Sequence, residues 1–303
     1  MRYLSPMLLL LVGLTTTLAT LHAQDDLLSA LNDTTPPPRE YTLATFKSTR
    51  IISGHSIETV SARHLDFRIS HRFGPLNGGA YNFFGLDQAT IRLGLEYGIS
   101  PRLMLGIGRS STEKTFDGFV KYKLLRQTFS NETPLSVTVL GATTLNSSLG
   151  RAQTERDYRF DHRLTHVAQL LLARKFSEQL SVQLMPTYLH RNLVELATDA
   201  NDVWALGIGG RMKVTRRMAL TGEYYYVLPG STRAPYQNAL ALGIDIETGG
   251  HVFQLHFTNS LGMVEPLFIA RTTDRWADGG IRFGFNISRT FNLGPRQTRA
   301  GGW

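Results

Sequence analysis

The sequence contains no cysteine, which excludes disulfides, thiolate metal sites and lipid attachment through an N-terminal cysteine. Beyond residue 23 it also lacks any run of about 18 consecutive apolar residues, the length that a membrane-spanning helix needs. Lys and Arg are dispersed along the chain with no long basic run, although the net charge is +8. We therefore expect neither a helical membrane protein nor a nucleic-acid-binding protein.

The composition lies between two extremes. The chain is 42% hydrophobic and 18% charged, with a mean hydropathy of -0.13. That is too balanced for a bundle of membrane helices and too apolar for a disordered chain.

The first 23 residues have the pattern of a cleaved signal peptide. Arg2 is followed by the apolar run MLLLLVGL, and Leu21-His22-Ala23 offers a cleavage site. The apolar run is too short to span a bilayer, which disfavours the alternative of an uncleaved anchor helix. Residues 24–62 are then expected to form a periplasmic linker and a possible lumen segment, and residues 24–38 (QDDLLSALNDTTPPP) predict the proline-rich linker itself.

Between residues 63 and 291, segments of about ten residues alternate between apolar and polar positions, as strands with two different faces do. In LDFRISHRF, for example, Leu65 and Phe67 alternate with Asp66 and Arg68. The twelve segments cover residues 65–73, 91–97, 103–110, 118–127, 135–144, 163–175, 180–190, 202–214, 218–228, 239–247, 251–260 and 280–291.

The connections between these segments alternate between short and long. Short turns at one rim and long loops at the other are typical of outer-membrane barrels, and an even number of strands puts both ends at the periplasmic rim. The predicted fold is therefore all-β, a transmembrane antiparallel up-and-down β-barrel of about 12 strands. It covers residues 63–291 and leaves residues 292–303 as a C-terminal tail.

The two faces of the segments fit this fold. One face carries charges that a polar lumen accepts, while the other carries aromatic residues suited to the membrane interfaces: Phe73, Tyr97, Tyr188, Phe253, Phe257 and Phe291. A secreted, soluble β-sandwich that binds a ligand remains the alternative, because period-2 alternation alone does not identify the solvent.

The last segment, IRFGFNISRTF, resembles the aromatic-rich terminal strand by which barrel-assembly machinery recognises its clients. We therefore expect that machinery as a partner during biogenesis, and outer-membrane lipid as the surroundings of the finished barrel.

Seven stretches carry a resemblance that extends over nearly the whole mature chain. They are residues 44–59 (ATFKSTRIISGHSIET), 65–74 (LDFRISHRFG), 84–99 (FGLDQATIRLGLEYGI), 173–187 (ARKFSEQLSVQLMPT), 223–230 (EYYYVLPG), 246–260 (IETGGHVFQLHFTNS) and 283–289 (FGFNISR). The chain resembles an uncharacterised bacterial outer-membrane β-barrel family that is catalogued as a domain of unknown function. The resemblance implies location and architecture but no activity and no catalytic residues.

The candidate site is a cluster of polar side chains that should face the lumen: Arg68, Arg72, Arg92, Glu96, Gln254, His256 and Arg282. It would either contact a solute in a narrow pore or form a hydrogen-bonded network that fills a small lumen, and we favour the network. Residues 44–59 should lie in the lumen as a constriction, with a periplasmic strand at the barrel mouth as the alternative.

Catalytic and metal sites are weakly indicated. Ser288, His256 and Asn286 are candidates for a lipid-hydrolysing set, but their register turns all three toward the lumen and no GxSxG-type turn is found. His162 and His166 should share a strand face about 13 Å apart, too far for one ion. We expect no cofactor and no metal.

The functional prediction is a non-enzymatic outer-membrane barrel, either a narrow channel for a small-molecule solute or a structural scaffold. The alternatives are a lipid-acting outer-membrane enzyme and the soluble binding protein.

Overall fold

The computed structural model describes residues 39–149, 159–232 and 234–294. The expected signal peptide (1–23) and linker (24–38) lie outside the described residues, as does the C-terminal tail from residue 295 on. The chain divides into a unit of residues 1–40 and a unit of residues 41–303, and every described helix and strand belongs to the second.

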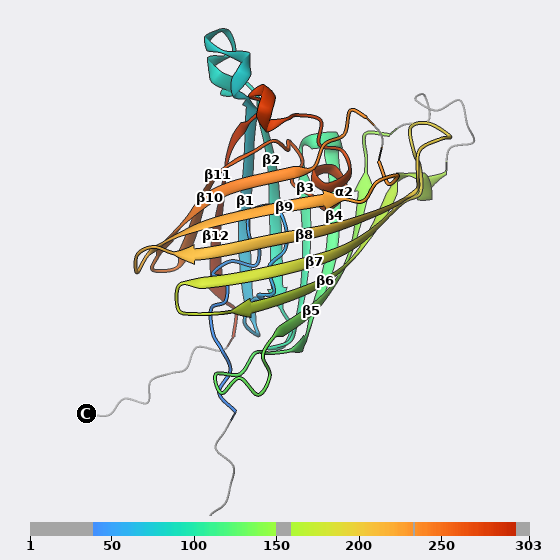
Figure 1. Ribbon diagram of the computed structural model, residues 1–303. Coiled ribbons are helices and arrows are strands. Elements are labelled where there is room, and N and C mark those ends of the chain that lie inside the picture. Colours follow the sequence, from blue (N-terminus) through green and yellow to red (C-terminus); the bar gives the residue numbers. More distant parts are fainter. Residues whose placement is uncertain (1–38, 150–158, 233, 295–303) are drawn as a thin grey trace, which may run out of the picture. The chain divides into compact units, whose positions relative to one another are not determined.

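Twelve antiparallel strands form a closed barrel in which each strand pairs with its sequence neighbours and β1 pairs with β12 (Figure 1). In chain order they are β1 (His64–Pro75), β2 (Ala89–Gly98), β3 (Leu103–Ser110), β4 (Thr115–Leu125), β5 (Ser136–Asn146), β6 (Leu164–Lys175), β7 (Leu180–Arg191), β8 (Asp202–Lys213), β9 (Met218–Val227), β10 (Ala239–Thr248), β11 (His251–Thr258) and β12 (Arg282–Asn292). The predicted twelve-strand barrel is confirmed. The sandwich alternative is wrong, because the β1–β12 pairing leaves one closed sheet rather than two packed ones.

The pleat of each strand separates its two faces. In β2, Leu93 and Leu95 point outward and are exposed, whereas Arg92 and Glu96 point into the barrel and are buried. The other strands repeat this pattern, so large apolar side chains cover the outside. Such an exterior suits lipid, since a water-soluble protein would leave it as an unusually large exposed apolar surface.

The two rims differ in the length of their connections. At the short-turn rim the turns cover residues 99–102, 126–135, 176–179, 214–217 and 249–250. At the long-loop rim the loops cover residues 76–88, 111–114, 147–163, 192–201, 228–238 and 259–281. The long loops carry the 3-10 helices η1 (Leu76–Gly78), η2 (Ala80–Gly85), η3 (Thr112–Lys114), η5 (Phe160–Arg163) and η6 (Trp276–Asp278), and the α-helix α2 (Glu265–Ala270). Among the described residues no helix is both long and apolar enough to cross a membrane, a finding that does not bear on crossing by strands.

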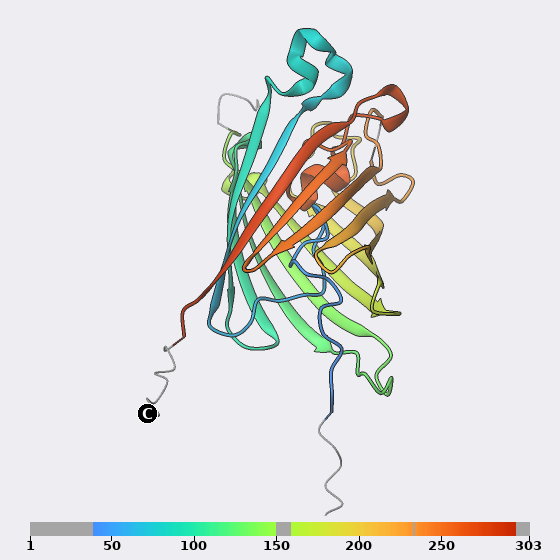
Figure 2. The same cartoon turned by 90° about the vertical axis from the view of Figure 1, so that its left-hand side faces the viewer.

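Residues 41–62 run inside the barrel and are called the inner loop below (Figure 2, blue). The loop starts at the short-turn rim, where the Thr42 amide donates to the carbonyl of Gln127 (2.8 Å). It turns back at a tip closed by the Arg50–His55 bridge and returns to the same rim, where Ala62 pairs with Gly98. Both ends of the inner loop therefore lie at one rim.

Apolar packing joins the inner loop, the wall and α2 into one core. Ile51 and Phe46 of the loop are almost fully buried with Met185 and Tyr225 of the wall and Phe268 of α2. Burying each large apolar side chain contributes about 1.5–3 kcal/mol. The wall makes room with glycine: a Cβ on Gly209 would lie 2.4 Å from the Cδ1 of Ile51.

Candidate functional site in the barrel interior

The seven residues of the expected cluster are all at most 9% exposed and all face the interior, but the structure distributes them over several groups rather than one. The inner loop determines this distribution, because its side chains and backbone lie between strands that would otherwise face one another.

Arg68 and Glu96 form the first group, on the neighbouring strands β1 and β2. The Nε of Arg68 lies 3.8 Å from Glu96 Oε1, and its Nη2 donates to Asp66 (3.2 Å). The inner loop joins this group, since Arg50 Nε is also 3.8 Å from Glu96 Oε1 and the Thr49 hydroxyl donates to Glu96. One buried carboxylate thus balances two arginines, one from the wall and one from the loop.

Gln254 and Asn286, adjacent on β11 and β12, bind the tip of the inner loop. The side-chain amide of Gln254 donates to the carbonyl of Ile51 (2.8 Å), and that of Asn286 donates to the carbonyl of Ile52 (2.9 Å). Asn286 also donates to Gln254 Oε1 (3.0 Å). These bonds satisfy carbonyls that would otherwise be buried without a partner.

Arg72 and His256 lie side by side next to this pair. Arg72 donates to the Ser53 hydroxyl (3.1 Å) and to Asn286 Oδ1 (3.3 Å). A Cβ on Gly284 would lie 2.5 Å from the Nε2 of His256 and 2.7 Å from the Cδ of Arg72, so glycine is needed where the two side chains meet.

Arg92 and Arg282 belong to separate ion pairs. Arg92 forms a two-pronged pair with Asp117 of β4, with Nε donating over 2.9 Å. Arg282 binds Asp274 at the long-loop rim, with 2.6 Å between Nη2 and Oδ2. Neither residue contacts the tip of the inner loop through a hydrogen bond or ion pair.

The charged wall residue Lys121 of β4 is fully buried and points to the inner loop. Its ammonium donates to three carbonyls of the inner loop, those of Thr49 (2.8 Å), Ser56 (3.0 Å) and Glu58 (3.1 Å). All three donors of the ammonium are therefore used by the loop backbone.

Glu223 of β9 plays the opposite role across the lumen. Its carboxylate accepts hydrogen bonds from three successive loop amides, those of Ile52 (3.1 Å), Ser53 (2.7 Å) and Gly54 (3.0 Å). Successive amides that converge on one anion form a nest, an arrangement that favours negative charge. The loop backbone is thus held by a cation on one side and an anion on the other.

The helix α2 lies inside the barrel near the long-loop rim, and the sequence reasoning missed it. All six of its residues are buried, and it contacts β6 and β9. Glu265 at its start points to the inner loop, where its Oε1 is 3.1 Å from Arg50 Nη1 and 3.4 Å from His55 Nε2. The apolar run in MVEPLFIA, unusual in a surface loop, was the signal that could have revealed it.

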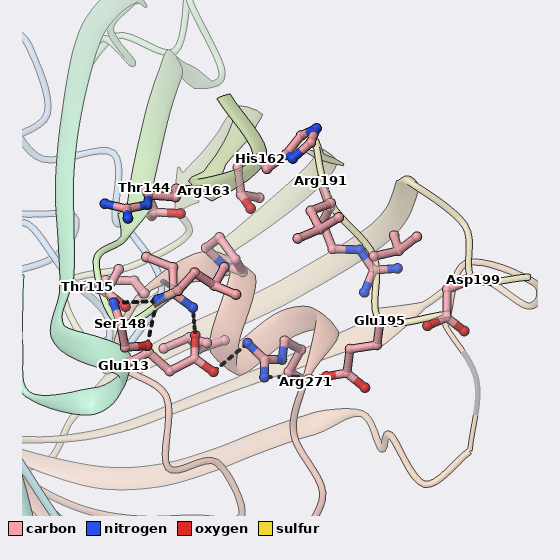
Figure 3. Close-up of a pocket in the computed structure, with 18 of the residues that line it drawn as sticks. Glu113, Thr115, Thr144, Ser148, His162, Arg163, Arg191, Glu195, Asp199 and Arg271 are labelled. Atoms are coloured by element: carbon pink, nitrogen blue, oxygen red, sulfur yellow. Dashed lines mark hydrogen bonds and ion pairs between the residues drawn. The ribbon is translucent and has the colours of Figure 1, made fainter. Parts of the chain in front are cut away.

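On the other side of α2, toward the long-loop rim, a cavity of about 660 Å³ is called the vestibule here (Figure 3). Val264, Pro266 and Leu267 contribute apolar side chains to its lining, and Arg271 crosses it to bind Glu113 (2.6 Å). The described interior therefore has two parts, the polar inner loop and an open chamber above α2.

The catalytic candidates are not assembled. Ser288 of β12 pairs with Val252 of β11, whereas His256 of β11 pairs with Gly284 of β12. Gly284 and Ser288 are four residues apart, so His256 and Ser288 are separated by about 13 Å along the strands, at 3.3 Å per residue. Asn286, between them, is engaged with the inner loop.

The expectation that His162 and His166 share a strand face is wrong. His162 lies in η5, before β6 begins, and lines the vestibule, whereas His166 is exposed on the outer face of β6. The strand starts one residue later than expected, at Leu164, and the turn before it breaks the alternation. Among the described residues no cluster of three or more His, Asp or Glu could hold a metal ion.

Residues 46–291 match the model of a family described as a membrane bound beta barrel domain (DUF5777). The chain belongs to this family. The sequence-based resemblance is thereby confirmed, and the protein is a membrane-bound β-barrel. No curated protein matches the sequence.

Several solved structures are similar in fold. The NanC porin is 11% identical with a TM-score of 0.45, over 75% of this chain and 98% of that one. The KdgM porin in complex with disordered oligogalacturonate is 11% identical with a TM-score of 0.47, over 75% and 99%. The outer membrane protein Omp33 of Acinetobacter baumannii is 7% identical with a TM-score of 0.41, over 76% and 98%. Likeness this distant carries no argument about function.

Proposed function

We propose that this protein is an outer-membrane channel for small solutes that its own inner loop closes at rest. The observation that carries the proposal is that Lys121 and Glu223 both hydrogen-bond to the backbone of the inner loop. The lumen wall is polar enough to hold water, and the segment that fills it is held through hydrogen bonds that water can replace.

The path of the inner loop supports its withdrawal. Both ends lie at the short-turn rim, so the loop can leave the lumen toward that side without threading through the barrel. Its polar groups would then bond to water, so its departure leaves few buried groups unsatisfied. The apolar contacts of Phe46 and Ile51 favour the closed state.

Location and biogenesis form part of the proposal. The even number of strands and the difference between the rims support an orientation with the short turns in the periplasm and the long loops outside the cell. Export would use residues 1–23 as a cleaved signal peptide, and barrel-assembly machinery would recognise β12. The protein would be a non-enzyme, because the two catalytic candidates, His256 of β11 and Ser288 of β12, lie far apart.

Conductance in planar bilayers tests the channel. The native protein should be closed for most of the recording, with rare openings. Glu223→Ala removes the acceptor of three loop amides and should give discrete, frequent current steps. Glu178→Ala, an exposed carboxylate in a short turn, is the matched control and should behave as the native protein does. A scaffold predicts no current steps in any of the three proteins, and that result would reject the channel.

A further inference from the structure

The vestibule has the size of a small-molecule site. Its volume of about 660 Å³ lies within the range of about 300–1,000 Å³ that is usual for ligand pockets. Five connections and the top of α2 surround it, and its wall combines hydroxyl, amide and charged groups with an apolar floor at Pro266 and Leu267.

One wall of the vestibule is a row of side chains on three adjacent strands. Thr144 of β5 pairs with Thr165 of β6, and Thr165 pairs with Arg191 of β7. All three line the cavity, so two hydroxyls and a guanidinium lie next to one another on the same face of the sheet.

Arg191 is the unusual member of this row. It is only 9% exposed, its Nη2 donates to the carbonyl of Ala200, and its Nε has no hydrogen-bond partner. No carboxylate of the described residues lies within ion-pair distance of it. Arg271, in the same cavity, differs, because it binds Glu113 (2.6 Å) and Glu195 (3.6 Å; Figure 3).

Asp199 and Glu195 act on the charge of Arg191 only from beyond ion-pair distance. A buried cation with no counterion in direct contact is costly, and a guanidinium edge matches the two oxygens of a carboxylate or phosphate. We propose that the vestibule binds a small hydroxylated organic anion, whose anionic group lies on Arg191. The threonine hydroxyls beside Arg191 and the carboxylates of Glu113 and Asp199 would bind the hydroxyl groups of the ligand. This site lies above α2 and does not require that the barrel conduct.

Calorimetric titration of the purified full-length protein in detergent tests the site with four probes. Glucuronate presents a carboxylate, glucose 6-phosphate presents a phosphate, glucose has no charge, and inorganic phosphate has no sugar. At least one sugar anion should bind, and glucose should bind at least tenfold more weakly or not at all. The two sugar anions show which anionic group the site prefers, and inorganic phosphate shows what the sugar hydroxyls add.

Substitutions of Arg191 assign the binding to this residue. Arg191→Gln keeps a donor for the Ala200 carbonyl but loses the charge, and should weaken binding of the sugar anion at least tenfold. Arg191→Lys keeps the charge without the planar fork and should give an intermediate affinity. Arg216→Gln, in a short turn at the opposite rim, makes the same chemical change outside the vestibule and should bind as the native protein does.

Three results would overturn the proposal: no binding of either sugar anion, equal binding of glucose, or unchanged binding by Arg191→Gln. A melting curve shows whether Arg191→Gln folds. If it does not fold, unchanged affinity of Arg191→Lys for the sugar anion would reject the proposal that the guanidinium of Arg191 binds the anionic group. Because binding is measured in detergent, these results are independent of whether bilayer recordings show current steps.

Discussion

Arg50 at the tip of the inner loop and Glu265 at the start of α2 form a buried ion pair, with 3.1 Å between Nη1 and Oε1, although 215 positions separate them in the chain. The same carboxylate oxygen lies 3.4 Å from His55 Nε2. Two residues of the tip therefore face one carboxylate of α2, and Arg50 forms an ion pair with it. The pair connects the segment that fills the lumen to the helix that forms the floor of the vestibule.

Removal of the charge of Glu265 should loosen the inner loop. Glu265→Gln leaves the buried Arg50 without its nearest counterion, and breaking such a pair from one side costs about 3–5 kcal/mol. The chain has no cysteine, so a single Ser53→Cys reports on the tip. We expect maleimide to label Ser53→Cys slowly in the otherwise native protein and at least tenfold faster when Glu265→Gln is added.

Glu178→Gln is the control for this measurement, since it removes an exposed carboxylate from a short turn. It should leave the labelling rate of Ser53→Cys unchanged. Equal labelling rates with and without Glu265→Gln would show that the ion pair does not hold the tip.

Gly54 offers a test in which a second substitution restores what the first disrupts. A Cβ on Gly54 would lie 2.2 Å from the hydroxyl of Tyr225 and 3.1 Å from its Cζ. Gly54→Ala should therefore displace the tip, and Tyr225→Phe should make room by removing the nearest atom. We expect frequent openings in bilayer recordings of Gly54→Ala and fewer in the double variant.

Tyr225→Phe alone is the control for that pair, because it removes the hydrogen bond from the hydroxyl to Met185 without adding any atom. It should stay mostly closed. If the double variant opens as often as Gly54→Ala, the clash with Tyr225 is not the cause of opening.

The barrel could be predicted from the sequence because its determinants are local. Alternation in each strand and the lengths of the turns are properties of short stretches, and they locate twelve strands to within a few residues. The first strand, for example, was expected at residues 65–73 and is observed at His64–Pro75. Boundaries shifted where a loop continues the alternation for a few residues, as before β2, which begins at Ala89 rather than Ile91.

The site could be predicted only in part, because it depends on contacts between distant segments. Period 2 correctly turns Arg68 and Glu96 inward, but it cannot show that Arg50 lies between them. Nor can it show that Lys121 and Glu223 bind backbone rather than each other. Those contacts follow from the path of the inner loop. A position in the lumen was expected for residues 44–59, but no local pattern shows where the loop turns back or which wall residues it meets.

Acidification should loosen the inner loop through His55, which lies outside the twelve strands. The pKa of His55 lies well below its usual value of 6.5. Burial is the largest cause, and the positive charges of Arg50 and Lys121 lower the pKa further. Glu265 of α2 and the ring of Phe119 on β4 also face it. The withdrawn loop would bind a proton that the docked loop does not, so docking should weaken as the pH falls through about 6.5.

Maleimide labelling of Ser53→Cys measures this effect if rates are corrected for thiol ionisation with a free cysteine peptide. The corrected rate should rise between pH 7.5 and pH 5.5, and His55→Gln should flatten the rise because glutamine does not titrate. A pH dependence of the same size in His55→Gln would assign the effect to another group.

Lipid contact can be measured at Ile107, near the middle of β3. Its side chain is 63% exposed on the outer face of the barrel. An arginine near the bilayer midplane destabilises a barrel by about 2–4 kcal/mol, whereas the same change at an exposed site of a water-soluble protein changes stability by about 0.5 kcal/mol or less. We expect Ile107→Arg to lower the free energy of unfolding in lipid vesicles, measured with guanidinium, by the larger amount.

Leu180→Arg is the matched substitution at the membrane boundary. Leu180 is the first residue of β7, at the short-turn rim, and its side chain is also outward and exposed. Because the cost of an arginine falls to about 0–1 kcal/mol near the interface, this variant should unfold almost as the native protein does. Two variants with equal free energies of unfolding would mean that lipid does not surround the middle of β3. A difference of several kcal/mol requires an apolar layer that covers Ile107 and ends before Leu180.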